Sequence, residues 1–364
     1  MQILATLATF DIVYGIQVYV YRNNYTEALT QDGSICKGHV FGAEVILHEH
    51  FASTQTEDPH KADIFFVPMY VGCIYYGSAN ATSMEMDEPL LEELSKYQKA
   101  IIDNEHFKRN NGSDHVFVLF FKAFFPHWRS LIPNSRVLTV ESEAEFEISS
   151  RYFQPQFRTH GSAPPFNPVT DIIIPPFIKP MQLRLIDSFS LPCGQSRKWF
   201  VSFFGKRWAD VDECHPIRQG LADLFGNRAD SFVRVVDSVK SYAPLSTVAS
   251  VMGDSSFCLI PRGRSAFTTR FFDALWAGCI PVILSDHMVL PFESEMDPGS
   301  YSVKWPTRAM DETLISYLQS ISPDRINSMR TAGARVRCAF VYADASLCPN
   351  DNAISHIVRS LTQH

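Results

Sequence analysis

Arginine and hydroxyl side chains gather in residues 256–293, which read SFCLIPRGRSAFTTRFFDALWAGCIPVILSDHMVLPFE. Arg262 and Arg264 flank a glycine in a Pro-Arg-Gly-Arg turn, and Arg270 follows six residues later. Guanidinium groups form strong charge-assisted hydrogen bonds with phosphate oxygens, often two at a time. The segment therefore predicts a site for a phosphorylated ligand.

Arg270 and Asp273 extend this prediction, because residues three apart on a helix share a face. The guanidinium group would meet a diphosphate and the carboxylate would meet ribose hydroxyls, so a nucleoside diphosphate fits both. The spacing alone leaves a second interpretation open. In that interpretation Arg262, Arg264 and Arg270 are solvated surface charges, and Asp273 only pairs with Arg270.

The elements expected around these residues form a strand, a loop, a helix and a second strand. Phe257–Ile260 and Cys279–Leu284 are continuous apolar runs typical of strands buried on both faces. Ser265, Thr268 and Thr269 are candidate N-caps of a helix that would stop at Gly278. A loop that leaves the carboxyl end of a strand and opens a helix places backbone amides and the positive helix end where phosphate binds.

This stretch resembles the nucleotide-sugar-binding signature of the exostosin family, glycosyltransferase family 47. The family pattern runs FCL-x-P-x-G, a polar helix start, R-x-x-E-A, a small-residue turn, C-x-P-V-x-x-S-D and a closing PF. The matching residues here are Phe257, Cys258, Leu259, Pro261, Gly263, Arg270, Asp273, Ala274, Cys279, Pro281, Val282, Ser285, Asp286, Pro291 and Phe292.

Weaker resemblance extends the match to about residues 16 to 305. Residues 58–68, DPHKADIFFVP, are similar to the family's DP-x-x-AD-x-FFVP element, and Val18–Tyr21 looks like its opening strand. Ser113-Asp114-His115, residues 171–175, and Phe203-Phe204-Gly205 followed by Ile217-Arg218 recur in the family's order.

The resemblance implies a GT-B fold, an α/β architecture in which two Rossmann-like domains face a cleft. It implies inverting transfer of a sugar from a UDP-sugar donor to a glycan or glycoprotein acceptor, without a metal or other cofactor, because basic side chains stabilise the leaving diphosphate. A homo- or hetero-oligomer with related transferases stays open. The residues expected to bind the nucleotide-sugar are Arg262, Gly263, Arg264, Ser265, Thr269, Arg270 and Asp273.

Three departures from the family pattern limit what carries over. Asp273 stands where glutamate is usual, Arg22 replaces a common aspartate, and Lys122-Ala123-Phe124 follows the third strand where histidine or aspartate is common. The alternative is therefore a non-catalytic exostosin-like subunit that binds nucleotide or carbohydrate without turnover. An inverting transfer needs a base near the acceptor hydroxyl, and the sequence leaves it unidentified among His39, Glu44, His48 and His127.

The rest of the chain predicts two consecutive α/β series. Short apolar runs rich in β-branched and aromatic residues predict buried strands at residues 18–21, 64–68 and 116–121. A helix is expected between the second and third of them, at residues 87–107. The series restarts after Leu191-Pro192 with Trp199–Gly205. We expect an acceptor-side domain over residues 1–190 and a nucleotide-sugar-binding domain over residues 191–364.

Other motifs are weaker. Asp210-Val211-Asp212 is a DxD triplet, a metal-binding motif of other glycosyltransferases, but it does not directly end an apolar strand. His48-Glu49-His50 lacks the i, i+4 spacing of a helical zinc site and is interpreted as a surface segment. No G-x-G-x-x-G follows a first strand and no phosphate-binding P-loop motif occurs, which disfavours NAD-binding and P-loop enzymes.

The net charge and the cysteine content limit which partners and which cellular compartment are expected. A net charge of −7 argues against a nucleic-acid binder. Eight cysteines without CxxC spacing and three glycosylation sequons, at Asn24, Asn80 and Asn111, favour the secretory pathway. Residues 1–10 are apolar but too short to span a bilayer, so we expect a Golgi or endoplasmic reticulum lumenal protein, membrane-anchored in its full-length form.

The cysteine positions also predict disulfides. Cys258 and Cys279 would begin adjacent parallel strands joined by one crossover helix, which brings their Cα atoms within disulfide reach. The alternative is that both are buried thiols. Proximity in sequence further suggests Cys36 with Cys73, Cys193 with Cys214, and Cys338 with Cys348.

Overall fold

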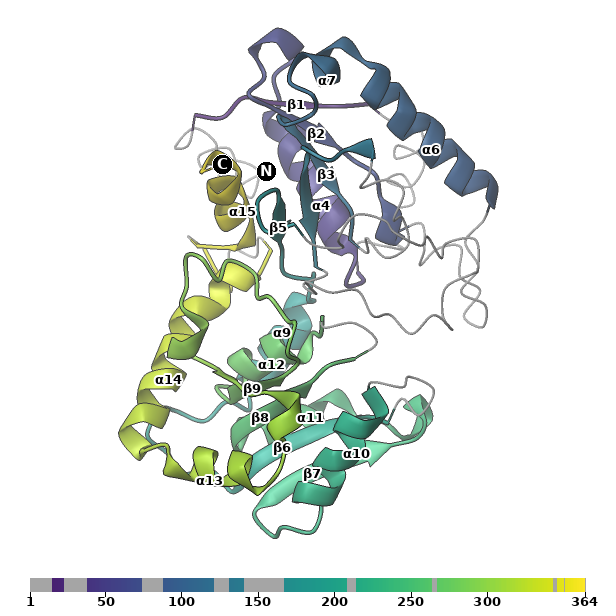
Figure 1. The fold of residues 1–364 in the computed structure, drawn as a ribbon. Coiled ribbons are helices and arrows are strands. Elements are labelled where there is room, and N and C mark those ends of the chain that lie inside the picture. Colours follow the sequence, from purple (N-terminus) through teal and green to yellow (C-terminus); the bar gives the residue numbers. More distant parts are fainter. Residues whose placement is uncertain are drawn as a thin grey trace. The chain divides into compact units, whose positions relative to one another are not determined.

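The computed structural model describes residues 15–22, 38–73, 88–120, 131–140, 167–207, 214–263, 267–342, 346–349 and 351–363. The chain divides into two compact units (Figure 1). The first unit comprises residues 1–177 and 341–364, and the second comprises residues 178–340.

The first unit is built on a parallel sheet whose strands follow the order of the chain, β1-β2-β3-β4-β5. The strands are β1 (Val18–Val20), β2 (Ile64–Val67), β3 (His115–Val118), β4 (Arg136–Thr139) and β5 (Asp171–Ile173). Its helices are α4 (Gly42–Thr54), η1 (Pro59–Lys61), α6 (Glu88–Asp103), α7 (Glu105–Arg109) and α15 (Ala353–Thr362).

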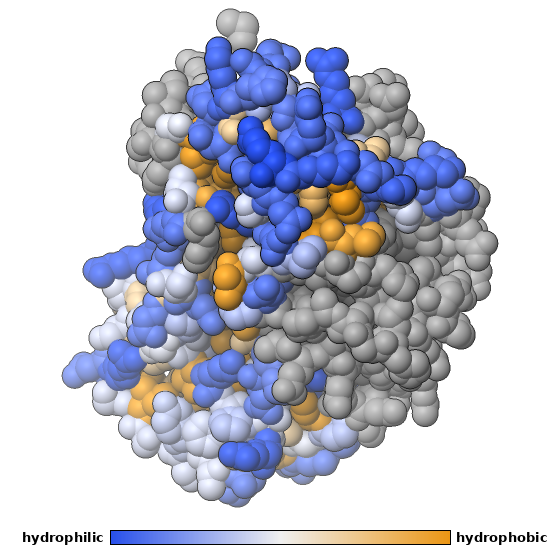
Figure 2. All heavy atoms as spheres, turned by 45° about the horizontal axis from the view of Figure 1, so that its top comes forward, coloured by the Kyte–Doolittle hydropathy of each residue, from blue (hydrophilic) through white to orange (hydrophobic). Residues whose placement is uncertain are grey.

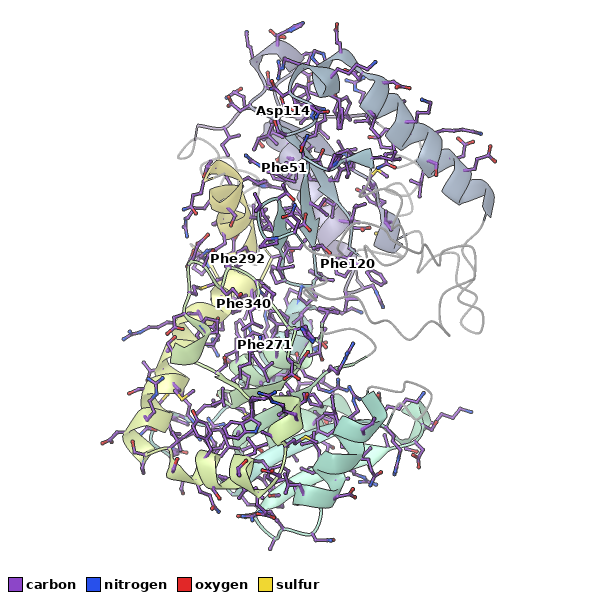
Figure 3. All side chains as sticks on the ribbon, viewed as in Figure 1. Phe51, Asp114, Phe120, Phe271, Phe292 and Phe340 are labelled. Atoms are coloured by element: carbon purple, nitrogen blue, oxygen red, sulfur yellow. A yellow bond between two sulfur atoms is a disulfide. The ribbon has the colours of Figure 1, made fainter. Side chains whose placement is uncertain are left out.

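The central strands of this sheet are buried on both faces, as their continuous apolar sequences predict. All four residues of β2 and all four of β3 are buried. Phe51 of α4 packs on Phe66 of β2 with ring centroids 4.8 Å apart, which fixes α4 against one face of the sheet (Figure 3). On β2 and β3, Phe65 and His115 stack with centroids 4.7 Å apart.

The second unit contains a parallel sheet in the order β10-β9-β8-β6-β7. The strands are β6 (Trp199–Lys206), β7 (Ser231–Val236), β8 (Ser255–Pro261), β9 (Ile280–Leu284) and β10 (Val303–Lys304). The helices are α9 (Pro180–Asp187), α10 (Cys214–Phe225), η4 (Val239–Ser241), α11 (Leu245–Gly253), α12 (Arg270–Trp276), η5 (Pro298–Ser300), η6 (Thr307–Ala309), α13 (Glu312–Ser320), α14 (Pro323–Val336) and η7 (Arg337–Phe340).

Two apolar groups hold the second unit together. On one side of the sheet, alternate strand residues such as Val201, Phe203 and Phe257 join the buried faces of α10 and α13 in a continuous core. Elsewhere, aromatic side chains anchor α12. Phe340 lies 6.1 Å from Phe271 and 6.4 Å from Phe292, centroid to centroid, and these rings gather at one place in the structure (Figure 3).

Each unit is a parallel sheet with helical crossovers. This confirms the predicted α/β fold class, the GT-B type, which consists of two Rossmann-like domains. The boundary differs from the predicted one at residue 190. Residues 178–190 belong to the second unit because α9 packs on α11 and α12. Residues 341–364 return to the first unit, where Arg136 donates a hydrogen bond to the carbonyl oxygen of Leu361.

On the face in Figure 2, hydrophobic residues form separate patches among hydrophilic ones. Within the described ranges no helix combines the length and the apolar character that a bilayer-spanning segment requires.

One disulfide prediction is confirmed and one is wrong. Cys258 and Cys279 are bonded, with Cα atoms 5.8 Å apart. Cys193 is a free, exposed thiol, so it does not pair with Cys214. The eight residues of β6 separate these two positions by roughly 26 Å of extended chain, at about 3.3 Å per residue. Cys73, Cys338 and Cys348 are also disulfide-bonded, and the pairings suggested for them stay predictions.

Candidate functional site

The strand order of the second sheet indicates where along its carboxyl ends a ligand would bind. From β6 the chain passes to β7 on one side, and then to β8 on the other side of β6. Such a reversal opens a crevice at the carboxyl ends of the two diverging strands, where ligands of open α/β sheets bind. The strand order of the first unit contains no comparable reversal among its five described strands. The candidate site therefore lies where β6 and β8 end.

A cavity of about 310 Å³ occupies this position. Phe204 of β6 and Ile260 of β8 line it, together with residues from β7, α11 and α12. Most of the lining is apolar or aromatic, and several of the lining elements contribute polar side chains. The polar side chains are Ser202, Arg234, Tyr242, Thr247, Thr269, Arg270 and Asp273.

Arg270, the first residue of α12, is held in place on the cavity wall. Its Nε donates a hydrogen bond to the carbonyl oxygen of Phe204, at 3.2 Å, and its guanidinium group lies over the ring of Phe203, 5.7 Å from the centroid. Tyr242, whose ring lies 6.0 Å from that of Phe204, interacts electrostatically with this guanidinium group. The cation is thus fixed at the end of β6, within reach of a ligand in the cavity.

Asp273 lies one turn further along α12 and is 9% exposed. Its Oδ1 accepts a hydrogen bond of 2.9 Å from Nε2 of Gln182, a residue of α9. Burial raises the pKa of Asp273 to about 6, and the Gln182 hydrogen bond and the charge of Arg270 oppose that rise. The carboxylate is therefore preorganised by two partners on the cavity wall.

The other predicted site residues are placed differently. Thr269 lines the cavity beside Arg270. Arg262 and Gly263 continue the path of β8 and, within the described lining, are not part of the cavity wall. Arg262 donates its backbone N–H to the carbonyl oxygen of Leu284 at 3.1 Å. Arg264 and Ser265 lie outside the described residues.

The two strands of the signature are locked together beside the cavity. β8 and β9 pair in register from Phe257 with Ile280 onward, and the Cys258–Cys279 disulfide joins them. Cys258 itself lines the cavity, and its sulfur lies 3.5 Å from the hydroxyl oxygen of Ser202. Asp286 of the signature is structural, because its carboxylate accepts hydrogen bonds from the backbone and hydroxyl of Thr307.

The first unit contains polar side chains at the end of β2. Glu44 is 1% exposed, and its two carboxylate oxygens accept hydrogen bonds from the backbone amides of Gly72, at 2.9 Å, and Cys73, at 3.1 Å. Burial raises the pKa of Glu44 to about 8. His48 hydrogen-bonds the hydroxyl of Tyr70 at 2.8 Å, and Tyr70 has a positive φ of 53°. Both contacts hold the segment that follows β2.

The interpretation of His48-Glu49-His50 as a surface segment is wrong for one of its residues. The segment lies within α4, where His50 is 3% exposed and packs beside Phe51. His48 is half-buried and only Glu49 is exposed. The DxD triplet at residues 210–212 and His127 lie outside the described residues. Among the residues that are described, no cluster of three or more His, Cys, Asp or Glu side chains has the geometry of a metal site.

Sequence reasoning missed Phe204 and Tyr242 on the cavity wall, and it missed Gln182, which contacts Asp273 from α9. Gln182 contacts Asp273 across 91 residues of sequence, so no local pattern indicates it. Tyr242 follows η4 and is 40% exposed, and both of these facts come from the structure rather than from a sequence pattern.

The sequence matches the family model described as the exostosin GT47 domain over residues 13–321. The match covers most of the chain, including both parallel sheets and the cavity of the second unit. This chain belongs to the exostosin GT47 family of glycosyltransferases.

Named relatives agree with that membership. The chain is 26% identical over 314 residues to a probable glucuronoxylan glucuronosyltransferase, IRX7, of Arabidopsis thaliana, covering 81% of this chain and 63% of that protein. It is 26% identical over 320 residues to a probable beta-1,4-xylosyltransferase, IRX10L, of the same plant, covering 85% of this chain and 71% of that protein. The chain thus spans about three fifths of the length of the first of these relatives.

A solved structure of OtsA without ligand is also similar, with 11% identity and a TM-score of 0.38. The similarity covers 82% of this chain and 86% of that one. A likeness at this level carries no argument about function.

Proposed function

We propose that this protein is an inverting glycosyltransferase that transfers a sugar from a UDP-sugar to a glycan or glycoprotein acceptor. The observation that carries the proposal is the cavity at the carboxyl ends of β6 and β8, with Arg270 and Asp273 on one wall. Family membership supports the reaction class, and the cavity supports binding of the donor through its nucleotide part.

The two charged side chains divide the donor between them in this proposal. Arg270 would bind the diphosphate, because a fixed guanidinium group forms charge-assisted bonds with phosphate oxygens and stabilises the charge that develops on the leaving group. Asp273 would accept hydrogen bonds from the ribose hydroxyls. Phe204 and Tyr242, whose ring centroids lie 6.0 Å apart on the cavity wall, would offer an apolar surface for the base.

The compartment is part of the proposal. Disulfides persist in oxidising compartments, and Cys258–Cys279 is buried beside the cavity. We propose that the protein works in the Golgi or endoplasmic reticulum lumen, membrane-anchored in its full-length form. The second candidate, a subunit that binds nucleotide without turnover, is favoured by Asp273, whose side chain is one methylene shorter than the family's usual glutamate.

Isothermal titration calorimetry tests the donor site. We expect the protein to bind UDP and Arg270→Ala to bind it at least about tenfold more weakly, as a charge-assisted phosphate contact is lost. Arg335→Ala is the matched control, because Arg335 is an exposed arginine of α14 outside the cavity. Equal UDP affinity in wild type and Arg270→Ala, with both folded, would remove Arg270 from the site.

Turnover separates the two candidates. A screen of UDP-sugars for release of UDP, with the anomeric configuration of the transferred sugar read by NMR, should find one donor that is consumed with inversion. UDP binding without consumption of any donor would identify the non-catalytic subunit instead.

A further inference from the structure

Arg218 is the largest side chain that is fully buried in the described residues, with 0% exposure. It projects from α10 toward the carboxyl ends of β6 and β8 and is not part of the cavity wall as described. Burying a guanidinium group is costly unless its donors are satisfied. Its hydrogen bonds therefore indicate what the residue is for.

The guanidinium group bridges the ends of the two strands that flank the cavity. Nε and Nη2 both donate to the carbonyl oxygen of Arg262, at 3.2 and 2.9 Å. Nη1 donates to the carbonyl oxygen of Lys206 at 2.5 Å. Lys206 is the last residue of β6, and Arg262 directly follows the last residue of β8. One side chain thus sets the spacing of both strand ends.

Phe203 connects this bridge to the cavity. The guanidinium carbon of Arg218 lies 5.6 Å from the centroid of the Phe203 ring, and that of Arg270 lies 5.7 Å from the same centroid. Gly205 leaves the space that this packing needs. A methyl group on Gly205 would come within 2.6 Å of the Phe203 ring and 3.3 Å of Nη1 of Arg218.

We propose that Arg218 is a positioning residue for the donor: it ties the backbone that follows β8 to the end of β6 and, through the Phe203 ring that it shares with Arg270, holds the cavity wall on which Arg270 lies. Because a trans peptide points its carbonyl and its N–H in opposite directions, turning the Arg262 carbonyl toward Arg218 turns the Gly263 N–H away from α10. This inference rests on the proposed UDP-sugar donor. Its structural part, the restraint on the loop, is measurable without any ligand.

The test uses Arg218→Lys with Arg330→Lys as the matched control. Lysine keeps the charge but loses the planar fork that bridges two carbonyl groups. Arg330 is also a buried arginine, 6% exposed, but it contacts the hydroxyl of Ser256 at the start of β8 rather than its end. Two quantities are measured on the full chain: the UDP dissociation constant, and hydrogen–deuterium exchange in peptides covering residues 203–207 and 257–263.

We expect Arg218→Lys to weaken UDP binding by about tenfold, because the strand ends and the Phe203 ring that position Arg270 are no longer held in place. Exchange should accelerate in the two peptides and stay unchanged in α13. Arg330→Lys should leave UDP binding and the exchange of residues 203–207 unchanged. Unchanged exchange in Arg218→Lys at both strand ends would overturn the proposal, as would equal weakening of UDP binding in both variants.

Failure of the donor assignment is distinguishable from failure of this inference. If the wild-type protein does not bind UDP, the donor proposal is wrong, and accelerated exchange confined to residues 203–207 and 257–263 still supports the restraint by Arg218. If Arg218→Lys does not fold, Gly205→Ala takes its place, since the added methyl group displaces Phe203 and Arg218 without removing a charge. Gly205→Ala with wild-type exchange and UDP affinity would overturn the proposal.

Discussion

The buried carboxyl group of Asp273 should make the stability of the second unit depend on pH. Burial raises its pKa from 3.8 to about 6 in the folded protein. In the unfolded chain the group is exposed and keeps its ordinary pKa. The folded state therefore binds the proton more tightly than the unfolded state. The contribution of the Asp273 carboxyl group to the free energy of unfolding is therefore largest below pH 3.8. It falls as the pH rises through about 6 and is constant above that.

The size of the effect follows from the two pKa values. A difference of about 2 pKa units corresponds to about 3 kcal/mol between the two protonation states. Asp273→Asn removes the ionisation but keeps a carbonyl oxygen for the Gln182 hydrogen bond. Because the pKa of about 6 already includes the attraction to Arg270, we expect the variant to gain about 1 to 3 kcal/mol at pH 8. For a unit of this size, each kcal/mol of added stability raises the melting temperature by roughly 2–4 °C.

Thermal unfolding of the full chain between pH 4 and pH 8 checks this expectation. The difference in melting temperature between Asp273→Asn and wild type should be near zero at pH 4 and should grow through pH 6. Asp230→Asn is the control, because hydrogen bonds from Arg228 lower the pKa of that exposed aspartate. A constant difference across the range, or a loss of stability at pH 8, would refute the assignment of a buried ionised carboxylate to Asp273.

Three further predictions concern other parts of the chain. Replacing Cys258 and Cys279 together by alanine should lower the free energy of unfolding by about 3 kcal/mol, from the 21-residue separation, as measured by urea denaturation; an unchanged midpoint would contradict this. Glu44→Gln should lower the melting temperature by removing about 1 to 3 kcal/mol, because its amide would face one of two backbone N–H donors; a variant as stable as wild type would show that these bonds are unimportant. Excess EDTA should leave sugar transfer unchanged, whereas inhibition reversed by added metal would assign Asp210 and Asp212 as ligands.

The buried strands could be predicted from sequence because parallel strands covered on both faces are continuous apolar runs. β2, β3, β8 and β9 all lie where such runs predicted them. The helix expected at residues 87–107 appears as α6 and α7, divided at Asn104, whose side chain caps α7.

Three of the described α-helices were missed, namely α4, α9 and α15, and the first two show why. The sequence of α4 alternates apolar residues with Glu44 and His50, both of which are buried, so it shows no amphipathic stripe. The eight residues of α9 are too few for a periodic pattern, although Pro180 at the first turn is a recognised start signal.

The candidate site could be predicted only where its residues are close in sequence. Arg270 and Asp273 share one helix, and their spacing indicated a common face. The contacts that orient them come from far away in the sequence: Gln182 precedes Asp273 by 91 residues, and Phe204, whose carbonyl oxygen accepts from Arg270, precedes it by 66. Such contacts depend on how helices pack on the sheet, which no local spacing encodes.

Photoaffinity labelling locates the donor most directly. The full chain is irradiated with a 5-azido-uracil analogue of UDP, with and without excess UDP, and labelled peptides are identified by mass spectrometry. The proposed site predicts label that UDP competes away, in peptides containing Phe204, Tyr242 or residues 245–252, which line the cavity of the second unit. Label that UDP competes away but that lies only in residues 1–177 would contradict the placement of the donor at the carboxyl ends of β6 and β8.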